Sequence, residues 1–207
     1  MKNFGLYIII TKPVLSYKRI AEICVKNEIE MLQLREKHLP DSEIVKIGRK
    51  IKSVTNGTKT NFVINDRPDI AALCEADYLH LGQNDIDIND ARKIIGNNIR
   101  VGISTHSVEQ AKKALEYNPD YIGFGPIFPT ITKAIPDPVT GTQSLSHVLT
   151  FANVPVVALG GIFPENINEV LKAGAKNVAL VRYLMETKDL DIKIKELKLI
   201  IQKYSTL

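Results

Sequence analysis

Two aspartates that follow neighbouring apolar runs are the residues best suited to bind a cation. Asp66 comes directly after the run that ends at Ile64-Asn65, and Asp85 follows Leu81. Carboxylate and amide oxygens, without histidine or cysteine companions, suit Mg²⁺ better than zinc. Asp66 could instead cap the following helix or pair with Arg67, and both alternatives stay open. The occurrence of a carboxylate at two neighbouring run ends favours the metal.

A basic group follows another apolar run. Gln33 and Arg35 fall on one side of an extended segment because side chains alternate in a strand, and Lys37 comes next. A surface patch or an Arg35–Glu36 pair is the plain alternative. An arginine that faces the inside of a small barrel would need a partner for its charge. An anionic ligand would supply it.

Later segments offer groups that suit a phosphate. Thr130, Thr132 and Lys133 lie at nearly alternate positions and could grip phosphate oxygens. The Gly160-Gly161 pair would let backbone N–H groups approach an anion, although it could also be a tight turn. Arg182 follows the last apolar run, and its presence favours phosphate binding over a plain turn.

Eight short apolar runs must position these groups. Each has three to five residues and is apolar on both faces, as expected for buried parallel strands. The runs are 6–10, 31–34, 62–64, 78–81, 100–103, 121–124, 156–159 and 178–181.

Amphipathic segments between the runs predict helices. Asp41 is a candidate N-cap, and Ser107 with Gln110 forms a capping-box pattern. His106, which precedes that helix, is expected to have a structural role. The predicted helices span 17–27, 41–52, 107–115, 89–95, 164–173 and 190–204.

Eight strand–helix repeats in 207 residues, about 26 residues each, predict a single-domain (β/α)₈ TIM barrel over 1–207. An open doubly wound sheet stays possible because closure is not visible in a sequence. In a barrel the carboxyl ends of the strands carry the chemistry, which is where the polar groups above lie. The segment 126–142, with four prolines, is too long for an ordinary turn and is expected to be an active-site loop.

Composition excludes several classes of protein. The 27 Lys and Arg against 23 Asp and Glu give a net charge of +4 without clustering, so no nucleic-acid partner is expected. No apolar run approaches the ~20 residues of a membrane span, and the start of the chain lacks a signal-peptide pattern. Cys24 and Cys74 are expected to be buried and reduced. Together these features predict a cytoplasmic domain with no membrane partner.

The motifs QLREK (33–37), INDR (64–67), HLGQND (80–85), GIST (102–105), DYIGFGPIFPTITK (120–133) and ALGGI (158–162) occur in family order over almost the whole chain. With them the sequence resembles the thiamine-phosphate synthase (thiamine-phosphate pyrophosphorylase) family. The resemblance implies a Mg²⁺-dependent transferase with two small-molecule substrates. Hydroxymethylpyrimidine diphosphate would ionise, lose pyrophosphate and be captured by the nitrogen of a thiazole phosphate to give thiamine monophosphate.

The resemblance also implies a role for each matching residue. Asp66 and Asp85 would hold Mg²⁺ on the diphosphate. The pyrimidine and diphosphate would be bound by Gln33, Arg35, Lys37, Asn65, Ser104 and Lys133, of which Arg35, Lys37, Ser104 and Lys133 form the catalytic group. The thiazole phosphate would be bound by Thr130, Thr132, Gly161, Val181 and Arg182. Arg182 departs from the family pattern, in which many members carry serine.

Three alternatives remain. A related thiazole tautomerase shares the barrel but relies on a histidine in the loop after the sixth strand, where this chain has Pro126. A non-catalytic barrel that binds a phosphorylated metabolite would have no need for the two aspartates. A phosphosugar isomerase would need an acid–base pair that the sequence does not place. The oligomeric state is left open, a homo-oligomer included.

Overall fold

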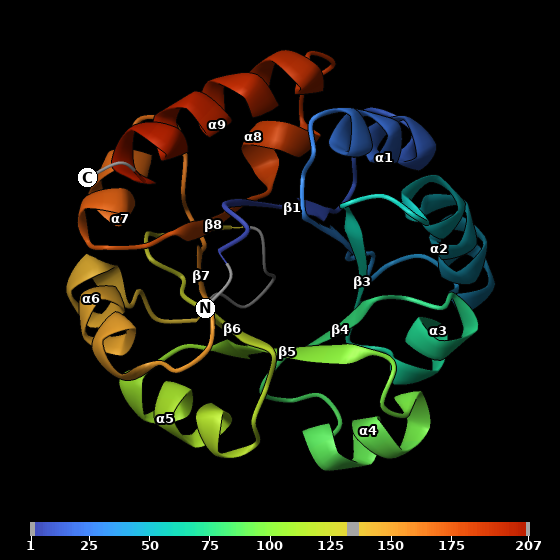
Figure 1. The fold of residues 1–207 in the computed structure, drawn as a ribbon, viewed down its shortest axis with the longest axis horizontal. Helices are drawn as coiled ribbons and strands as arrows, with labels where there is room; N and C mark the ends of the chain where they lie inside the picture. Colours follow the sequence, from blue (N-terminus) through green and yellow to red (C-terminus); the bar gives the residue numbers. More distant parts are fainter. Residues whose placement is uncertain (1–2, 132–136, 206–207) are drawn as a thin grey trace.

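Eight parallel strands form a closed barrel in a computed structural model, which describes residues 3–131 and 137–205. Each strand pairs with the next in chain order, and β1 closes the ring on β8 through Tyr7↔Ala179 and Ile8↔Leu180. Figure 1 looks along the barrel and shows the helices as an outer ring. The predicted barrel is confirmed, and the open sheet is excluded. The strands are β1 Leu6–Ile10, β2 Met31–Leu34, β3 Asn61–Asn65, β4 Tyr78–Leu81, β5 Arg100–Thr105, β6 Tyr121–Phe124, β7 Val156–Leu159 and β8 Asn177–Leu180.

The helices follow the strands in turn. Those over the described residues are α1 Tyr17–Lys26, α2 Asp41–Thr55, α3 Pro68–Leu73, α4 Ile88–Ile95, α5 Val108–Glu116, α6 Gly141–Phe151, α7 Ile167–Lys172, α8 Arg182–Met185 and α9 Leu190–Ser205. The short helices α3 and α8 and the weakly amphipathic α6 had not been predicted. The first two are too short for a helical period to show, and α6 begins within the long loop expected after the sixth strand.

Local capping is partly as expected. The Ser107 side chain accepts a hydrogen bond from the backbone N–H of Gln110 and caps α5, as predicted. Asp41 was predicted as an N-cap but is the first helical residue of α2, after Pro40. There its carboxylate lies in the acidic first turn and makes an ion pair with Arg67. The predicted strand 178–181 lies one residue earlier, so Val181 falls in the loop after β8.

The core has two layers. Between the barrel and the helices lies a large apolar layer that includes Ile8, Leu32 and Phe62, all fully buried. Inside the barrel, a smaller cluster around Tyr7, Met31 and other side chains fills the axis. The alternation of side chains along each strand separates the two layers. Cys24 and Cys74 are buried and free, as expected, and burial raises the pKa of both thiols.

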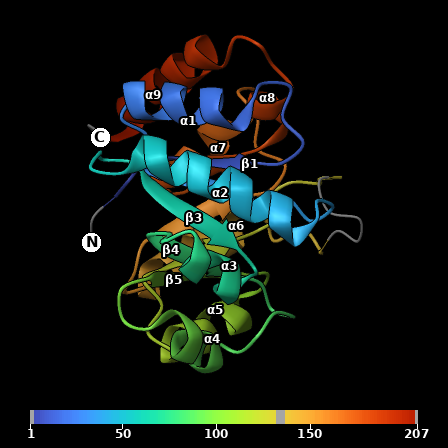
Figure 2. The same cartoon turned by 90° about the vertical axis from the view of Figure 1, so that its right-hand side faces the viewer.

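Among the described residues, no helix has both the length and the apolar character needed to cross a bilayer. All eight strands point the same way, so the loops from each strand to its following helix gather at one end of the barrel. Figure 2 shows the barrel from the side, with the arrowhead of β3 pointing toward that end. Most of the predicted site residues that the structure describes line the pockets at that end.

Candidate active site

The carboxyl ends of the strands surround a polar cavity of about 680 Å³. Residues from most of the strand ends line it, including Asn65, Asp66, Asp85, Ser104 and Arg182. A narrower, mainly apolar pocket of about 80 Å³ adjoins it near β7 and β8. Arg35, His106 and Val181 line both spaces, so the two form one continuous mouth.

The two predicted metal ligands meet in this cavity. Burial and the neighbouring Asp66 carboxyl raise the pKa of the half-buried Asp85. Lys37 partly offsets this effect, and its Nζ lies 2.7 Å from Oδ2 of Asp66. The backbone N–H of Gly82 donates to Asp85 Oδ2 over 2.6 Å and fixes that side chain. The two carboxyl groups therefore interact with each other, and the Lys37 ammonium is the positive charge beside them.

The backbone helps to bring Asp66 into this position. Asp66 has a φ of +64°, a left-handed conformation that aspartate tolerates better than most residues. Its N–H donates to the carbonyl of His80 on the neighbouring strand β4 over 2.8 Å. Arg67 pairs with Asp41 and Asp69 rather than serving Asp66. Of the two alternatives left open for Asp66, the structure therefore shows neither the Arg67 pair nor a cap, since no side chain caps α3.

Arg35 lies just after β2 and faces the same carboxylates. Burial lowers the pKa of its guanidinium, and the nearby charges of Asp66, Glu36 and Asp85 act in the opposite direction. Glu36 itself is buried and accepts hydrogen bonds from the Lys12 N–H and the Tyr17 hydroxyl, which fixes the loop after β1. Arg35 lines the cavity, where its guanidinium could also form an ion pair with an anionic ligand.

The opposite side of the mouth is built from backbone rather than charged side chains. Gly160 and Gly161 follow β7 with φ values of +91° and +67°. A Cβ on Gly161 would lie 2.6 Å from the Phe128 carbonyl oxygen and 2.7 Å from that of Pro129. Glycine is therefore required where the two loops cross. The loops leave the pocket lined by Gly160, Gly161, Thr130 and Pro126.

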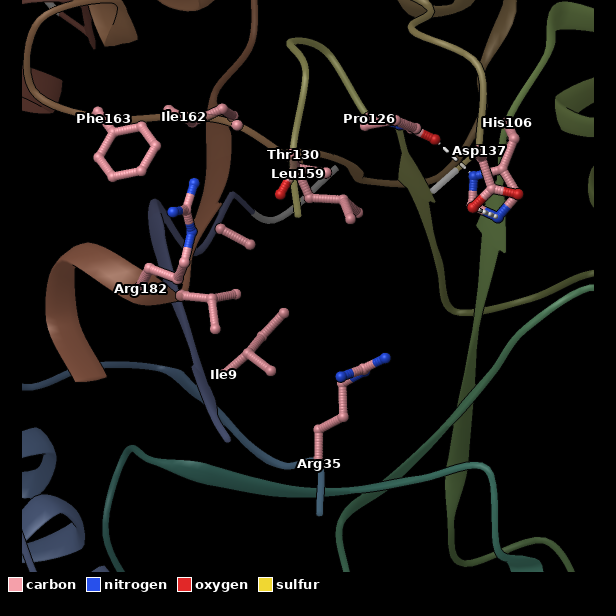
Figure 3. Close-up of a pocket in the computed structure, with 15 residues that line it drawn as sticks. Ile9, Arg35, His106, Pro126, Thr130, Asp137, Leu159, Ile162, Phe163 and Arg182 are labelled. Atoms are coloured by element: carbon pink, nitrogen blue, oxygen red, sulfur yellow. Dashed lines mark hydrogen bonds and ion pairs between the residues drawn. The ribbon is translucent and has the colours of Figure 1, made fainter. Parts of the chain in front are cut away.

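Arg182 brings the positive charge to this side. It is the first residue of α8, and its guanidinium carbon lies 5.1 Å from the centre of the Phe163 ring. Figure 3 shows the side chain directed toward Phe163, on the other side of Ile9 from Arg35. Both arginines line the same narrow pocket.

The structure shows further polar residues at the site, of which His106 was expected to have a structural role and the others were not predicted. His106 binds the Gly125 carbonyl oxygen through Nδ1, and its Nε2 lies 3.5 Å from Asp137, as Figure 3 shows. Tyr7, His80 and Tyr121 form a buried hydrogen-bonded row inside the barrel. Tyr7, His80 and Tyr121 could have been predicted from the sequence, because each is a polar aromatic residue within a short apolar strand.

The remaining predicted residues are placed as follows. Gln33 is buried inside the barrel below the cavity, while Asn65 and Ser104 line the cavity. Thr132 and Lys133 lie outside the described residues. Within the described ranges, no cluster of three or more His, Cys, Asp or Glu side chains is arranged to hold a metal by itself. A cation at Asp66 and Asp85 would need further ligands from its substrate and from water.

A closed (β/α)₈ barrel whose mouth carries an acidic pair, two arginines and a glycine-lined pocket is typical of enzymes that act on phosphorylated small molecules. Comparison with known proteins narrows the class. The family model described as thiamine monophosphate synthase matches residues 6–184, and the chain belongs to this family of transferases of thiamine biosynthesis.

Individual relatives agree with this assignment. The thiamine-phosphate synthase of Lawsonia intracellularis is 40% identical over 194 residues, which cover 91% of this chain and 89% of the relative. That of Caldicellulosiruptor saccharolyticus is 37% identical, covering 89% of this chain and 84% of the relative. Among solved structures, a thiamine phosphate pyrophosphorylase from Pyrococcus furiosus superposes with a TM-score of 0.86 at 30% identity, over 97% of this chain and 96% of that one.

Proposed function

We propose that this enzyme joins hydroxymethylpyrimidine diphosphate to a thiazole phosphate and releases pyrophosphate, with thiamine monophosphate as the product. The observation that carries the proposal is the meeting of Asp66, Asp85, Lys37 and Arg35 in one cavity, across the mouth from the Gly160-Gly161 turn. Membership of the family supports the same activity.

The acidic pair fits a Mg²⁺ ion bound together with the diphosphate. Mg²⁺ keeps several waters and is commonly bound by one or two carboxylates plus substrate phosphates, so two aspartates suffice. Burial and the Asp66 carboxyl raise the pKa of Asp85 although Lys37 lies beside the pair, which supports a site that a further cation would stabilise. Asp66 and Asp85 would hold the ion, which supplies charge neutralisation of the diphosphate as it leaves.

The basic residues assist the same departure. The bond between the pyrimidine methylene carbon and the diphosphate oxygen breaks with its electron pair on the oxygen, so negative charge grows on the pyrophosphate. Arg35 and Lys37 lie where they can bind that charge. Fixed positive groups in a half-buried site stabilise such charge better than water does. We assign Gln33, Asn65, Ser104 and Lys133, with Arg35 and Lys37, to the binding of the pyrimidine and its diphosphate.

The second substrate occupies the other side of the mouth. Gly161, Val181 and Arg182 bind its phosphate, with Thr130 and Thr132 completing the group. The glycines allow the backbone to approach the phosphate, and Arg182 adds a full positive charge. The thiazole nitrogen then donates its electron pair to the pyrimidine methylene carbon, and the new C–N bond replaces the broken C–O bond.

Incubation of the purified protein with both substrates and Mg²⁺ tests the proposal. We expect pyrophosphate and thiamine monophosphate in equal amounts, and loss of both products in EDTA. Release of no pyrophosphate, with isomerisation of a thiazole carboxylate phosphate instead, would establish the tautomerase. Tight binding of phosphorylated ligands without any turnover would establish the non-catalytic barrel.

A further inference from the structure

A row of hydrogen-bonded side chains crosses the inside of the barrel below the cavity. Gln33 Nε2 donates to the Tyr7 hydroxyl over 2.9 Å, and this hydroxyl lies 2.8 Å from that of Tyr121. The Tyr121 hydroxyl lies 2.8 Å from Nδ1 of His80, whose Nε2 lies 2.8 Å from Oγ of Ser104. The row therefore joins Gln33 on β2 to Ser104 on β5, two residues assigned above to the binding of the pyrimidine diphosphate.

The barrel is shaped to hold this row. Gln33, Tyr7 and Tyr121 are each no more than 2% exposed. Gly102, on β5, leaves the space that the Tyr121 ring occupies, because a Cβ there would overlap the ring. The imidazole of His80 stacks on the same ring, with centres 5.5 Å apart. A side chain at Gly102 would displace the centre of the row.

The amide at the Gln33 end favours one direction of donation along the row. An amide nitrogen can only donate, so the Tyr7 oxygen accepts from Gln33. The Tyr121 oxygen is the other hydrogen-bond partner of the Tyr7 hydroxyl, and we infer that the Tyr7 O–H donates to it. The Tyr121 O–H is then turned to Nδ1 of His80. An imidazole that accepts at Nδ1 carries its proton on Nε2, which donates to Oγ of Ser104.

We propose that this row fixes His80 as the Nε2–H tautomer and thereby presents the Ser104 hydroxyl proton to the cavity. Ser104 Oγ accepts from His80, so its O–H is directed to an acceptor on the substrate, a pyrimidine ring nitrogen or a diphosphate oxygen. Tyr7, Tyr121 and His80 are positioning residues because they act through Ser104. The role in turnover rests on the proposed function, whereas the tautomer does not.

Nitrogen NMR of the protein labelled with ¹⁵N-histidine tests the tautomer directly. The chain has four histidines, and a His80→Asn variant identifies the signals of His80. We expect the proton on Nε2 and an unprotonated Nδ1. The Nδ1–H tautomer would overturn the proposal, because it requires a row that donates in the reverse direction. This result is independent of whether the protein has any transferase activity.

A double-mutant cycle tests the positioning role. Tyr121→Phe should lower kcat about tenfold in the parent protein, the size expected for one lost buried hydrogen bond, and by less than about twofold when Ser104→Ala is already present. Tyr78→Phe is the matched control, because Tyr78 packs edge-on against the Tyr121 ring but its hydroxyl is outside the row. Equal effects of Tyr121→Phe in both backgrounds, in protein with an unchanged melting temperature, would overturn the coupling to Ser104.

Discussion

The two sides of the active-site mouth bind negative charge by different means. The side formed by β2, β3 and β4 uses charged side chains, with Arg35 and Lys37 beside Asp66 and Asp85. The side formed by β6, β7 and β8 uses glycine backbone and Arg182, and Arg35 from the first side also lines its pocket. The first arrangement fits a diphosphate with a cation, and the second fits a single phosphate. The difference suggests that the two substrates are recognised separately, and variants can test each side alone.

Removing one carboxylate should have the largest effect. Asp66→Asn and Asp85→Asn should each lower turnover at least about 100-fold, since one electrostatic group in a preorganised site contributes about that much. Pyrophosphate release at saturating substrates is the measurement. Asp69→Asn is the control, because Asp69 lies on α3 and pairs with Arg67. Full activity of both site variants would refute the assignment of the acidic pair.

A side chain at Gly161 should disable only the second side. Gly161→Val should raise the KM for the thiazole phosphate about 100-fold, because hydrogen bonds to a charged group are worth about 1.5–3 kcal/mol. The KM for the pyrimidine diphosphate should change little. Gly174→Ala is matched in its positive φ, but its Cβ would meet only Leu149 at 3.5 Å, far from the pocket. An equal rise in both KM values would argue against two separate sides.

Arg182 should have a smaller effect on the same substrate. Arg182→Ser should raise the KM for the thiazole phosphate about tenfold through loss of one charge-assisted contact. Arg19→Ser, on the exposed face of α1, serves as the control. A rise confined to the KM for the pyrimidine diphosphate would contradict the assignment of Arg182 to the thiazole phosphate.

The acidic pair should also reveal itself through pH. Folding raises the pKa of Asp85, so between the ordinary value of about 3.9 and the folded pKa the folded chain keeps a proton that the unfolded chain has lost. Across that interval the stability of the metal-free protein should fall slightly as the pH rises. Thermal unfolding at a series of pH values measures this, and Asp85→Asn should flatten the slope. A slope unchanged in that variant would show that Asp85 is not the group responsible.

The sequence predicted most of the barrel because its strands are short, mainly apolar runs. It missed α3 and α8, which are too short to show a helical period, and α6, which begins within the predicted loop. It placed the last strand one residue late. Closure of the barrel depends on pairing between β1 and β8, at opposite ends of the chain, so no single segment predicts it.

The two sides of the site also differed in how well they could be predicted from the sequence. Arg35, Asp66 and Asp85 could be selected because their charged side chains indicate which ligands they bind, and because each follows a predicted strand. The Gly160-Gly161 turn could only be suggested, since its need for glycine comes from the carbonyl oxygens of Phe128 and Pro129 on another loop. The buried row from Gln33 through Tyr7, Tyr121 and His80 to Ser104 depends on contacts between five strands, which spacing along the chain does not show.

The most direct test is a crystal structure of the protein with pyrophosphate and Mn²⁺ in place of Mg²⁺, with the metal located by its anomalous scattering. We expect the ion at about 2.1 Å from carboxylate oxygens of both Asp66 and Asp85, and the pyrophosphate against Arg35 and Lys37. An ion bound elsewhere, or pyrophosphate held at the Gly160-Gly161 turn without Arg35, would contradict the division of the mouth into two sides.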